Sequence, residues 1–354
     1  MYLDIIFNIR SKFYDKHCSN HEECLSFCRM GEYNMKTKLN IIEYLFIFIF
    51  MIYAFSGCAN STEANQLISD EHLHNKSYYF EPKINDDNHT YVYNGNTIHS
   101  SYLIHGGEEN TEIGLFLLIN GIPHKFHISN ISTEDKFMNV IDIEKDGHME
   151  IEVSLDPTIG TKGDILNVDI FSIKSPSYDL ASEAVEERSD HILYQGTGFK
   201  IEIEEDTINT ICNGLDNYTL NPITKEERAN YNTDDGSNML DNFSFFALQQ
   251  DMETSQIIST DGMANAVFRS FGAESNNCKT TLFINHEPVR IMDSDYLEYE
   301  VNENNEVLFD LEIDTKNSEE NSVIYCITSY IRRDDPEQRT LITKTKSALL
   351  MNEQ

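Results

Sequence analysis

The stretch Met149-Glu150-Ile151-Glu152-Val153-Ser154-Leu155 alternates apolar and polar residues without interruption. In a β-strand, such alternation places the apolar side chains on one face and the polar side chains on the other. A similar stretch, Val307-Leu308-Phe309-Asp310-Leu311-Glu312-Ile313, begins 158 residues later (149 to 307). The two stretches predict equivalent half-buried strands in two copies of one domain.

The similarity between the two copies extends upstream of these strands. Residues 96–126 align without gaps with residues 261–291, and the segment between the aligned blocks is seven residues shorter in the second copy. The matched pairs are Gly107 with Gly272, Glu109 with Glu274, Leu117 with Leu282, Ile119 with Ile284, Asn120 with Asn285 and Pro123 with Pro288. Order and spacing therefore predict an internal repeat.

Each copy consists of short alternating runs separated by turn residues, which is typical of antiparallel β-structure. Asp146-Gly147 and Asn304-Asn305 lie between such runs and predict tight hairpin turns. Residues 166–173 and 323–330 predict the closing strands. The expected fold class is all-β, with two immunoglobulin-like antiparallel β-sandwiches; a small barrel is the alternative architecture.

These patterns also suggest domain boundaries. We expect the first sandwich over residues 77–178, a linker with a short helix over 179–196, the second sandwich over 197–335 and a C-terminal tail over 336–354. The alternating run at 198–204 is expected to begin the second sandwich, and the polar stretch 230–241 is expected to be a loop within it.

The N-terminal part has the three regions of a secretory signal when it is read from Met35. Lys36 and Lys38 form a positive end, an uncharged apolar run covers 44–55, and small residues precede Cys58. A run of this length is short for a membrane-spanning helix, so it favours a hydrophobic signal helix over 35–57. A single-pass anchor with the C-terminal part outside the cell is the alternative.

The end of this signal, Phe55-Ser56-Gly57-Cys58, resembles the bacterial lipobox, although Phe55 stands where the family usually has leucine. The resemblance implies that a diacylglyceryl group is attached to Cys58 and that the chain is cleaved just before it. Residues 58–76 then predict a polar tether. Both this interpretation and the anchor place the repeats outside the membrane.

Residues 1–34 are an unusual prefix for a signal peptide, so we interpret Met35 as the true start and the prefix as spurious or disordered. The prefix carries thiol and imidazole groups that could bind zinc, but their spacing matches no standard finger. These residues are His17, Cys18, His21, Cys24 and Cys28.

The net charge of −34 lies entirely downstream of residue 57, because residues 1–57 hold six basic and six acidic residues. An acidic surface repels the phosphate backbone, which argues against nucleic-acid binding and favours water, cations and basic surfaces. Cysteine is sparse after Cys58: Cys212, Cys278 and Cys326 are too few for a disulfide scaffold, although Cys278 and Cys326 could pair.

The search for catalytic motifs predicts no enzyme. His105-Gly106-Gly107 resembles an oxyanion-hole segment of esterases, but the chain has no Gly-x-Ser-x-Gly, so Gly107 and Gly272 are interpreted as a shared turn. No cofactor is expected; calcium is a weak possibility at the acidic loops 85–88 and 232–238. His124 and His127 are interpreted as a surface pair rather than a metal site.

The combination of lipobox, tether and acidic β-repeats resembles uncharacterised surface lipoproteins of low-GC Gram-positive bacteria. The resemblance implies a lipid-anchored protein on the extracytoplasmic face of the cell membrane. The expected function is a non-catalytic binding or spacer module with an envelope protein or glycan as partner. The alternatives are a solute- or glycan-binding lipoprotein associated with a transporter and a hydrolase that uses scattered residues.

Overall fold

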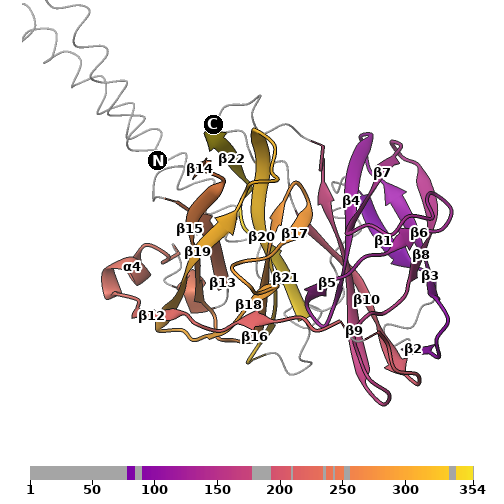
Figure 1. The fold of residues 1–354 in the computed structure, drawn as a ribbon, viewed down its shortest axis with the longest axis horizontal. Helices are drawn as coiled ribbons and strands as arrows, with labels where there is room; N and C mark the ends of the chain where they lie inside the picture. The colour runs from indigo at the N-terminus through magenta and orange to yellow at the C-terminus, as the bar shows by residue number, and fades with distance from the viewer. Residues whose placement is uncertain are drawn as a thin grey trace, which may run out of the picture. The chain divides into compact units, whose positions relative to one another are not determined.

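The computed structural model describes residues 78–83, 90–177, 193–208, 210–233, 237–241, 244–250, 256–334 and 340–353. Two β-sandwiches follow one another along this part of the chain (Figure 1), so the predicted all-β class with immunoglobulin-like sandwiches is confirmed. The prefix 1–34, the signal peptide, the lipobox, the tether and residues 179–192 of the predicted linker lie outside the described residues.

The first sandwich consists of two separate sheets. One has the strand order β1 (Tyr78–Pro82), β3 (Ile98–Gly106), β8 (His148–Leu155) and β6 (His127–Ile128). The other has the order β2 (Thr90–Tyr93), β10 (Leu193–Ile203), β9 (Ile165–Lys174) and β4 (Thr111–Ile119), and β4 also pairs with β5 (Ile122–Pro123) and β7 (Met138–Ile143).

The second sandwich is one continuous sheet folded into two layers. One layer contains β13 (Ser244–Gln249), β15 (Met263–Gly272), β19 (Asn305–Asp314) and β12 (Thr219–Pro222). The other contains β22 (Ala348–Glu353), β20 (Asn321–Arg332), β16 (Ser275–Ile284), β18 (Tyr296–Val301) and β11 (Gly214–Leu215), with β17 (Glu287–Val289) on β16 and β21 (Thr340–Lys344) on β20. Strand β14 (Gln256–Thr260) pairs with both β22 and β15 and joins the layers. Two short helices, α4 (Lys225–Ala229) and the 3-10 helix η3 (Met239–Asp241), precede β13.

The strand pairings repeat between the two sandwiches. The order β1-β3-β8 corresponds to β13-β15-β19, and β2-β10-β9-β4 corresponds to β14-β22-β20-β16. The second strand of each copy runs parallel to the last strand of that copy: β2 is parallel to β10, and β14 is parallel to β22. The remaining pairings in these series are antiparallel. The predicted internal repeat is therefore present in the topology. The strands predicted at 166–173 and 323–330 are β9 and β20, but they do not close the sandwiches, because β10 and β22 follow them and pair with them.

The predicted domain boundary is wrong. Strand β10 pairs with β9, and its residues Phe199, Ile201 and Ile203 lie in the core of the first sandwich. It therefore ends the first sandwich instead of beginning the second. By the same equivalence, the predicted tail contains β21 and β22, which pair with β20. Alternation shows that a strand is half-buried, but it does not show which sheet the strand joins.

The predicted hairpin turns connect strands that do not pair with each other. Asp146 has the expected positive φ of 53°, but the turn joins β7 to β8, which belong to different sheets. The equivalent turn before Asn305 joins β18 to β19. Among the described residues, two-residue hairpin loops lie instead at Asn120-Gly121, Asp261-Gly262 and Asn285-His286, and all six residues have positive φ.

The gap-free alignment is also one residue out of register in β3. Tyr102 lies opposite Ile151, whereas Phe268 lies opposite Phe309, so the true offset in this strand is 166 (268 − 102). Gly106, not Gly107, is consequently the counterpart of Gly272. The turn after β15 is two residues shorter than the turn after β3, and a bulge within β16 restores one residue.

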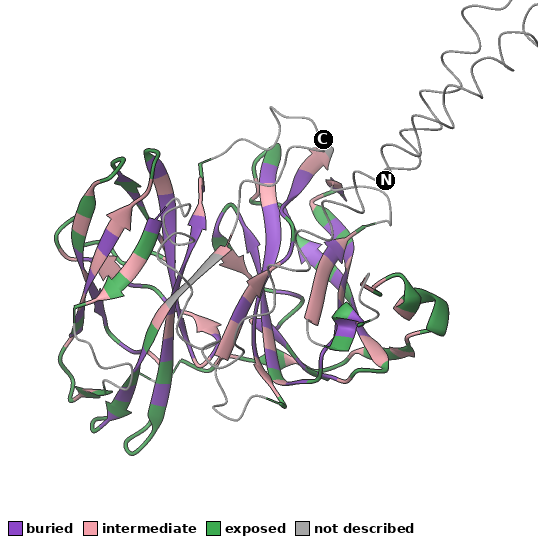
Figure 2. Cartoon of the chain, turned by 180° about the vertical axis from the view of Figure 1, so that it is seen from behind, coloured by how far each residue is buried: buried purple, intermediate pink, exposed green. Residues whose placement is uncertain are grey.

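Each sandwich has its own core, and a third cluster joins them. Buried residues recur along the strands of both sandwiches (Figure 2). The third cluster, called here the joint, consists of Phe116, Leu118, Phe171 and Ile173 from β4 and β9 together with Phe283, Tyr325, Ile327 and Ile342 from β16, β20 and β21. Equivalent sheets of the two sandwiches thus bury apolar side chains against each other.

Candidate functional site

The two sandwiches differ most at the edge next to β8 and its counterpart β19. In the first sandwich a bridge between Phe126 and Lys136 encloses a nine-residue loop, 127–135, which supplies the edge strand β6. In the second sandwich the equivalent bridge joins Ile291 to Ser294 and encloses only Met292 and Asp293. The seven-residue difference seen in the sequence therefore removes the edge strand of the second copy.

Strand β12, from the segment between the sandwiches, covers part of the edge left open. It pairs with β19 from Asn305 to Leu308. In the first sandwich β6 pairs with Val153 and Ser154, whose counterparts 158 residues on are Leu311 and Glu312. Among the described residues these two are paired only on their β15 side. Within the part of the chain that the structure describes, the half of the β19 edge from Phe309 to Asp314 is consequently uncovered.

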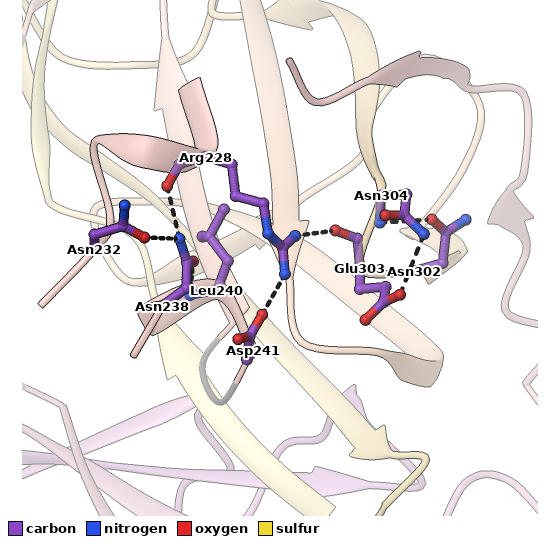
Figure 3. A network of polar contacts seen from close by, with 8 residues as sticks. All are labelled: Arg228, Asn232, Asn238, Leu240, Asp241, Asn302, Glu303 and Asn304. Carbon is purple, nitrogen blue, oxygen red and sulfur yellow. Dashed lines mark hydrogen bonds and ion pairs between the residues drawn. The ribbon is translucent and has the colours of Figure 1, made fainter. Parts of the chain in front are cut away.

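A polar network holds β12 and α4 against the turn before β19 (Figure 3). Thr224 forms a capping box with Glu227 at the start of α4. The Arg228 guanidinium donates to the carbonyl oxygen of Glu303 at 2.7 Å and also pairs with Asp241. The N–H of Ile223 donates to the Asn304 carbonyl at 2.8 Å. These contacts fix where β12 ends on β19.

A groove lies beside the uncovered half of this edge and encloses about 330 Å³. It is lined by residues of β15, β19 and two neighbouring turns: Gln250, Asn265, Ala266, Val267, Met292, Asp310, Leu311 and Glu312. Met292 is 51% exposed and has a positive φ of 54°. The groove thus places apolar surface next to carboxylates and an open strand edge.

The charge of the groove is uncompensated. Asp310 and Glu312 are exposed, and within the described residues neither side-chain carboxylate has an ion-pair or hydrogen-bond partner. Near the start of the same strand, Glu306 forms an ion pair with Arg269 of β15. The two carboxylates of the groove therefore favour a cationic partner.

The structure brings together a serine and a histidine that sequence analysis missed. The Nδ1 atom of His99 lies 2.7 Å from the Oγ of Ser154, across β3 and β8. The same nitrogen faces Glu152 at 3.5 Å, whereas a catalytic histidine uses one nitrogen for the nucleophile and the other for its acid. Ser154 is fully buried and also hydrogen-bonds Ser129. This pair is a strand-to-strand contact without access for a substrate.

The predicted surface histidine pair is corrected by the structure. His124 is buried, its Nε2 lies 3.1 Å from the carbonyl oxygen of Asp156 and 3.3 Å from the backbone nitrogen of Thr158, and burial lowers its pKa. His127 instead begins β6 and contacts Asp135 at 2.7 Å. The two rings have separate partners, and His124 serves the packing of the first sandwich.

The His105-Gly106-Gly107 segment also has a structural role. His105 contacts Glu81 at 2.9 Å and stacks on Tyr79 with a centroid distance of 4.3 Å. A side chain at Gly106 would collide with the carbonyl oxygen of Glu144. The glycine at position 106 is therefore required by the close approach of two backbone segments.

The predicted calcium loops lie partly outside the described residues, and the predicted disulfide is absent. Residues 85–88 and 234–236 lie outside them, and Asn238 donates to the Asn232 side chain at 2.8 Å (Figure 3). Among the described residues no three of His, Cys, Asp and Glu gather closely enough to hold a metal ion. Cys278 and Cys326 are both buried free thiols, so the suggested disulfide is not formed, and Cys212 is free and half-buried.

The joint contains ionisable groups whose pKa values are shifted by burial. The Lys344 ammonium lies 4.6 Å from the Tyr325 ring centroid, and burial lowers its pKa from 10.5 to about 7. His286 accepts from the Tyr325 hydroxyl at 2.9 Å and donates to the Pro176 carbonyl of the first sandwich at 2.8 Å; burial lowers its pKa too. On β9, burial raises the pKa of Asp169 to about 6. Of these groups, Lys344 and His286 contact Tyr325 of the joint, and His286 also links to the first sandwich.

Comparisons with known proteins give no family. No family model and no curated protein matches the chain. A crystal structure of a protein of unknown function from Porphyromonas gingivalis W83 is similar with a TM-score of 0.24 and 8% identity, covering 79% of this chain and 100% of that chain. The YadV chaperone gives 0.21 and 8% over 77% and 100%. The CsuC–CsuE chaperone–tip adhesion subunit complex of Acinetobacter baumannii gives 0.21 and 10% over 79% and 100%.

Likenesses at these TM-scores carry no argument about function, and the fold assignment is based on the strand pairing of the chain itself. No helix among the described residues is long and apolar enough to cross a membrane.

Proposed function

We propose that this chain is a non-catalytic, lipid-anchored surface protein of the cell envelope. A lipid on Cys58 holds it at the extracytoplasmic face of the membrane, and the two joined sandwiches act as a binding or spacer module. The observation that best supports a binding role is the groove on the second sandwich, where Asp310 and Glu312 lie unneutralised beside an open strand edge.

A non-catalytic role is supported by the condition of the reactive groups. The Ser154 hydroxyl, which has a histidine beside it, is buried. Burial also raises the pKa of the Cys278 thiol to about 12, which keeps it protonated and unreactive at neutral pH. A general base or nucleophile has to be reachable by its substrate. Neither group meets this requirement.

The lipid anchor is supported by the sequence 55–58 and by the signal-like segment before it. We would measure the intact mass of the membrane-extracted protein after expression in a Gram-positive host. The expected mass is that of a chain that begins at an acylated Cys58. Cys58→Ala should be unprocessed or released into the medium, whereas the matched variant Cys212→Ala should be processed like the wild type.

A full-length, unacylated wild-type protein in the membrane would contradict the anchor and favour a single-pass segment. Equal processing of the Cys58→Ala variant would also overturn the proposal. The alternative of a solute- or glycan-binding lipoprotein associated with a transporter stays a prediction.

A further inference from the structure

We propose that the open half of the β19 edge, together with the groove beside it, binds an extended, basic segment of a partner protein as an added β-strand. The inference extends the binding role proposed above and does not depend on the lipid anchor. It follows from the internal repeat, because the first sandwich shows what occupies the equivalent place.

The first sandwich shows which backbone groups face this edge. The N–H of Ser129 donates to the carbonyl of Glu152 at 2.8 Å, and the Asn130 side chain donates to the carbonyl of Glu150 at 2.8 Å. The backbone of Glu150 and Glu152 thus points towards the edge strand. Their counterparts 158 residues on are Leu308 and Asp310, and Leu308 lies opposite Thr219, the first residue of β12. From Asp310 onward, the ladder of the second sandwich is available for a further strand.

Strand β6, which occupies the equivalent edge of the first sandwich, indicates which sequence pattern would fit the open edge of the second. Along β6 and the residues beside it, Phe126 and Ile128 are buried, and His127 between them faces outward. Alternation of this kind lets one face of the strand pack while the other meets the outer face of the sheet. In the second sandwich, the outer face of β19 next to the vacant position carries Asp310 and Glu312. A lysine or arginine at alternate positions of the incoming strand would lie beside them.

A partner protein is favoured over a second copy of this chain. Two β19 edges placed against each other would bring Asp310 and Glu312 of both copies together, and the chain as a whole carries a net charge of −34. Like charges across a strand pair are destabilising. Self-association through this edge is therefore disfavoured, and a basic segment is the complementary occupant.

The test uses the full-length protein in detergent micelles and a fluorescent peptide of alternating lysine and valine as the probe. We expect saturable binding, together with slower amide hydrogen exchange in residues 309–314 when the peptide is bound. The double variant Asp310→Lys with Glu312→Lys should bind the peptide about tenfold more weakly at low ionic strength. The matched control is Glu202→Lys with Glu204→Lys, which changes the net charge equally at exposed positions of the first sandwich. It should bind like the wild type.

Two further peptides separate strand addition from simple charge attraction. N-methylation of alternate amides removes donors of the ladder and should abolish binding, although the peptide charge is unchanged. Replacing lysine by glutamate should also abolish it. Equal weakening in both double variants, unchanged binding of the N-methylated peptide or no binding by the wild type would overturn the proposal. Concentration-dependent dimers that the Asp310 and Glu312 substitutions dissolve would assign the edge to a second copy instead. Loss of lipidation at Cys58 would leave this result intact, so the two proposals fail separately.

Discussion

The first sandwich supplies all the strands of its β3-β8-β6 edge from within its own repeat, whereas the second takes its edge strand from the segment that precedes it. Strand β6 follows β5 directly in the first copy, but β12 comes from residues 219–222, ahead of the whole second copy. Unpaired sheet edges are prone to further pairing, and proteins usually cover them. The comparison shows that β12, from a neighbouring segment, replaces only part of the edge strand that is missing where the loop is seven residues shorter.

The joint is where the two copies depend on each other, and its disruption should have the largest effect. Phe116 stacks on Phe171 at 5.3 Å and meets Phe283 of the other sandwich edge-on at 5.6 Å. We expect Phe116→Ala to lower the free energy of unfolding by about 3–5 kcal/mol, because a fully buried aromatic side chain is lost. Denaturant titration combined with hydrogen exchange should show faster exchange in β4 and β9 and also in β16 and β20.

Phe199→Ala is the matched control, because Phe199 is buried in the core of the first sandwich alone. It should lose a similar free energy but change exchange only within the first sandwich. If Phe116→Ala also left the second sandwich unchanged, the two copies would be independent, and the joint would contribute nothing to their common stability.

A smaller loss is expected where the second copy uses its borrowed strand. Asn221 of β12 lies opposite Glu306 of β19, and two residues on, the N–H of Ile223 donates to the carbonyl of Asn304 directly before β19. Because every second N–H of a strand points to the same neighbour, the Asn221 N–H also faces β19. Asn221→Pro removes this donor and should cost about 1–3 kcal/mol, measured by denaturant titration. It should also accelerate exchange in residues 305–308.

The control for this substitution is Ile208→Pro in the same connecting segment, since Ile208 is 89% exposed and lies outside the strands. It should leave stability nearly unchanged. Equal stability of the two proline variants would mean that β12 does not hold the edge.

The repeat and most strands could be predicted from sequence because half-buried strands alternate visibly, as β8 and β19 do. The assignment of β10 could not be predicted, since the residues it packs against are distant in the sequence and alternation is the same for either sheet. Strand β12 gives almost no signal: Thr219-Leu220-Asn221-Pro222 is short and ends in proline. Its position at the edge of β19 follows from the strand pairing in the structure and not from its sequence.

Only one part of the candidate site could be predicted from the sequence. The shorter loop was read directly from the sequence, but its consequence, an open edge beside Asp310 and Glu312, required the pairing of β12 to be known. The contact between His99 and Ser154 was missed because no motif relates residues 55 positions apart on neighbouring strands.

The smallest predicted effect concerns a charge that the two copies do not share. Lys344 lies opposite Ile327 in the second sandwich. In the first sandwich, Phe171 takes the place of Ile327 and lies opposite Gln195, so Gln195 is the counterpart of Lys344. The folded pKa of Lys344 is lowered to about 7 from 10.5, so between these values the unfolded chain binds the proton more tightly than the folded chain. Stability should therefore rise with pH across this range, and the cost of the buried ammonium is complete below about pH 7.

Lys344→Gln, which introduces the residue of the first copy, should remove this dependence. Between about pH 6 and 8.5 the wild type should gain about 1–2 kcal/mol relative to the variant, as measured by denaturant titration at each pH. Measurements stop at 8.5 because the buried thiols of Cys278 and Cys326, whose pKa values are raised, act in the opposite direction above their unfolded pKa of 9. The Lys344 charge itself contributes to lowering the pKa of His286, so the difference between the two proteins also contains a contribution from His286 near its ordinary pKa of 6.5, and the rise above pH 7 is the part that reports on Lys344. Parallel curves for the two proteins would mean that the Lys344 side chain is hydrated rather than enclosed in the joint.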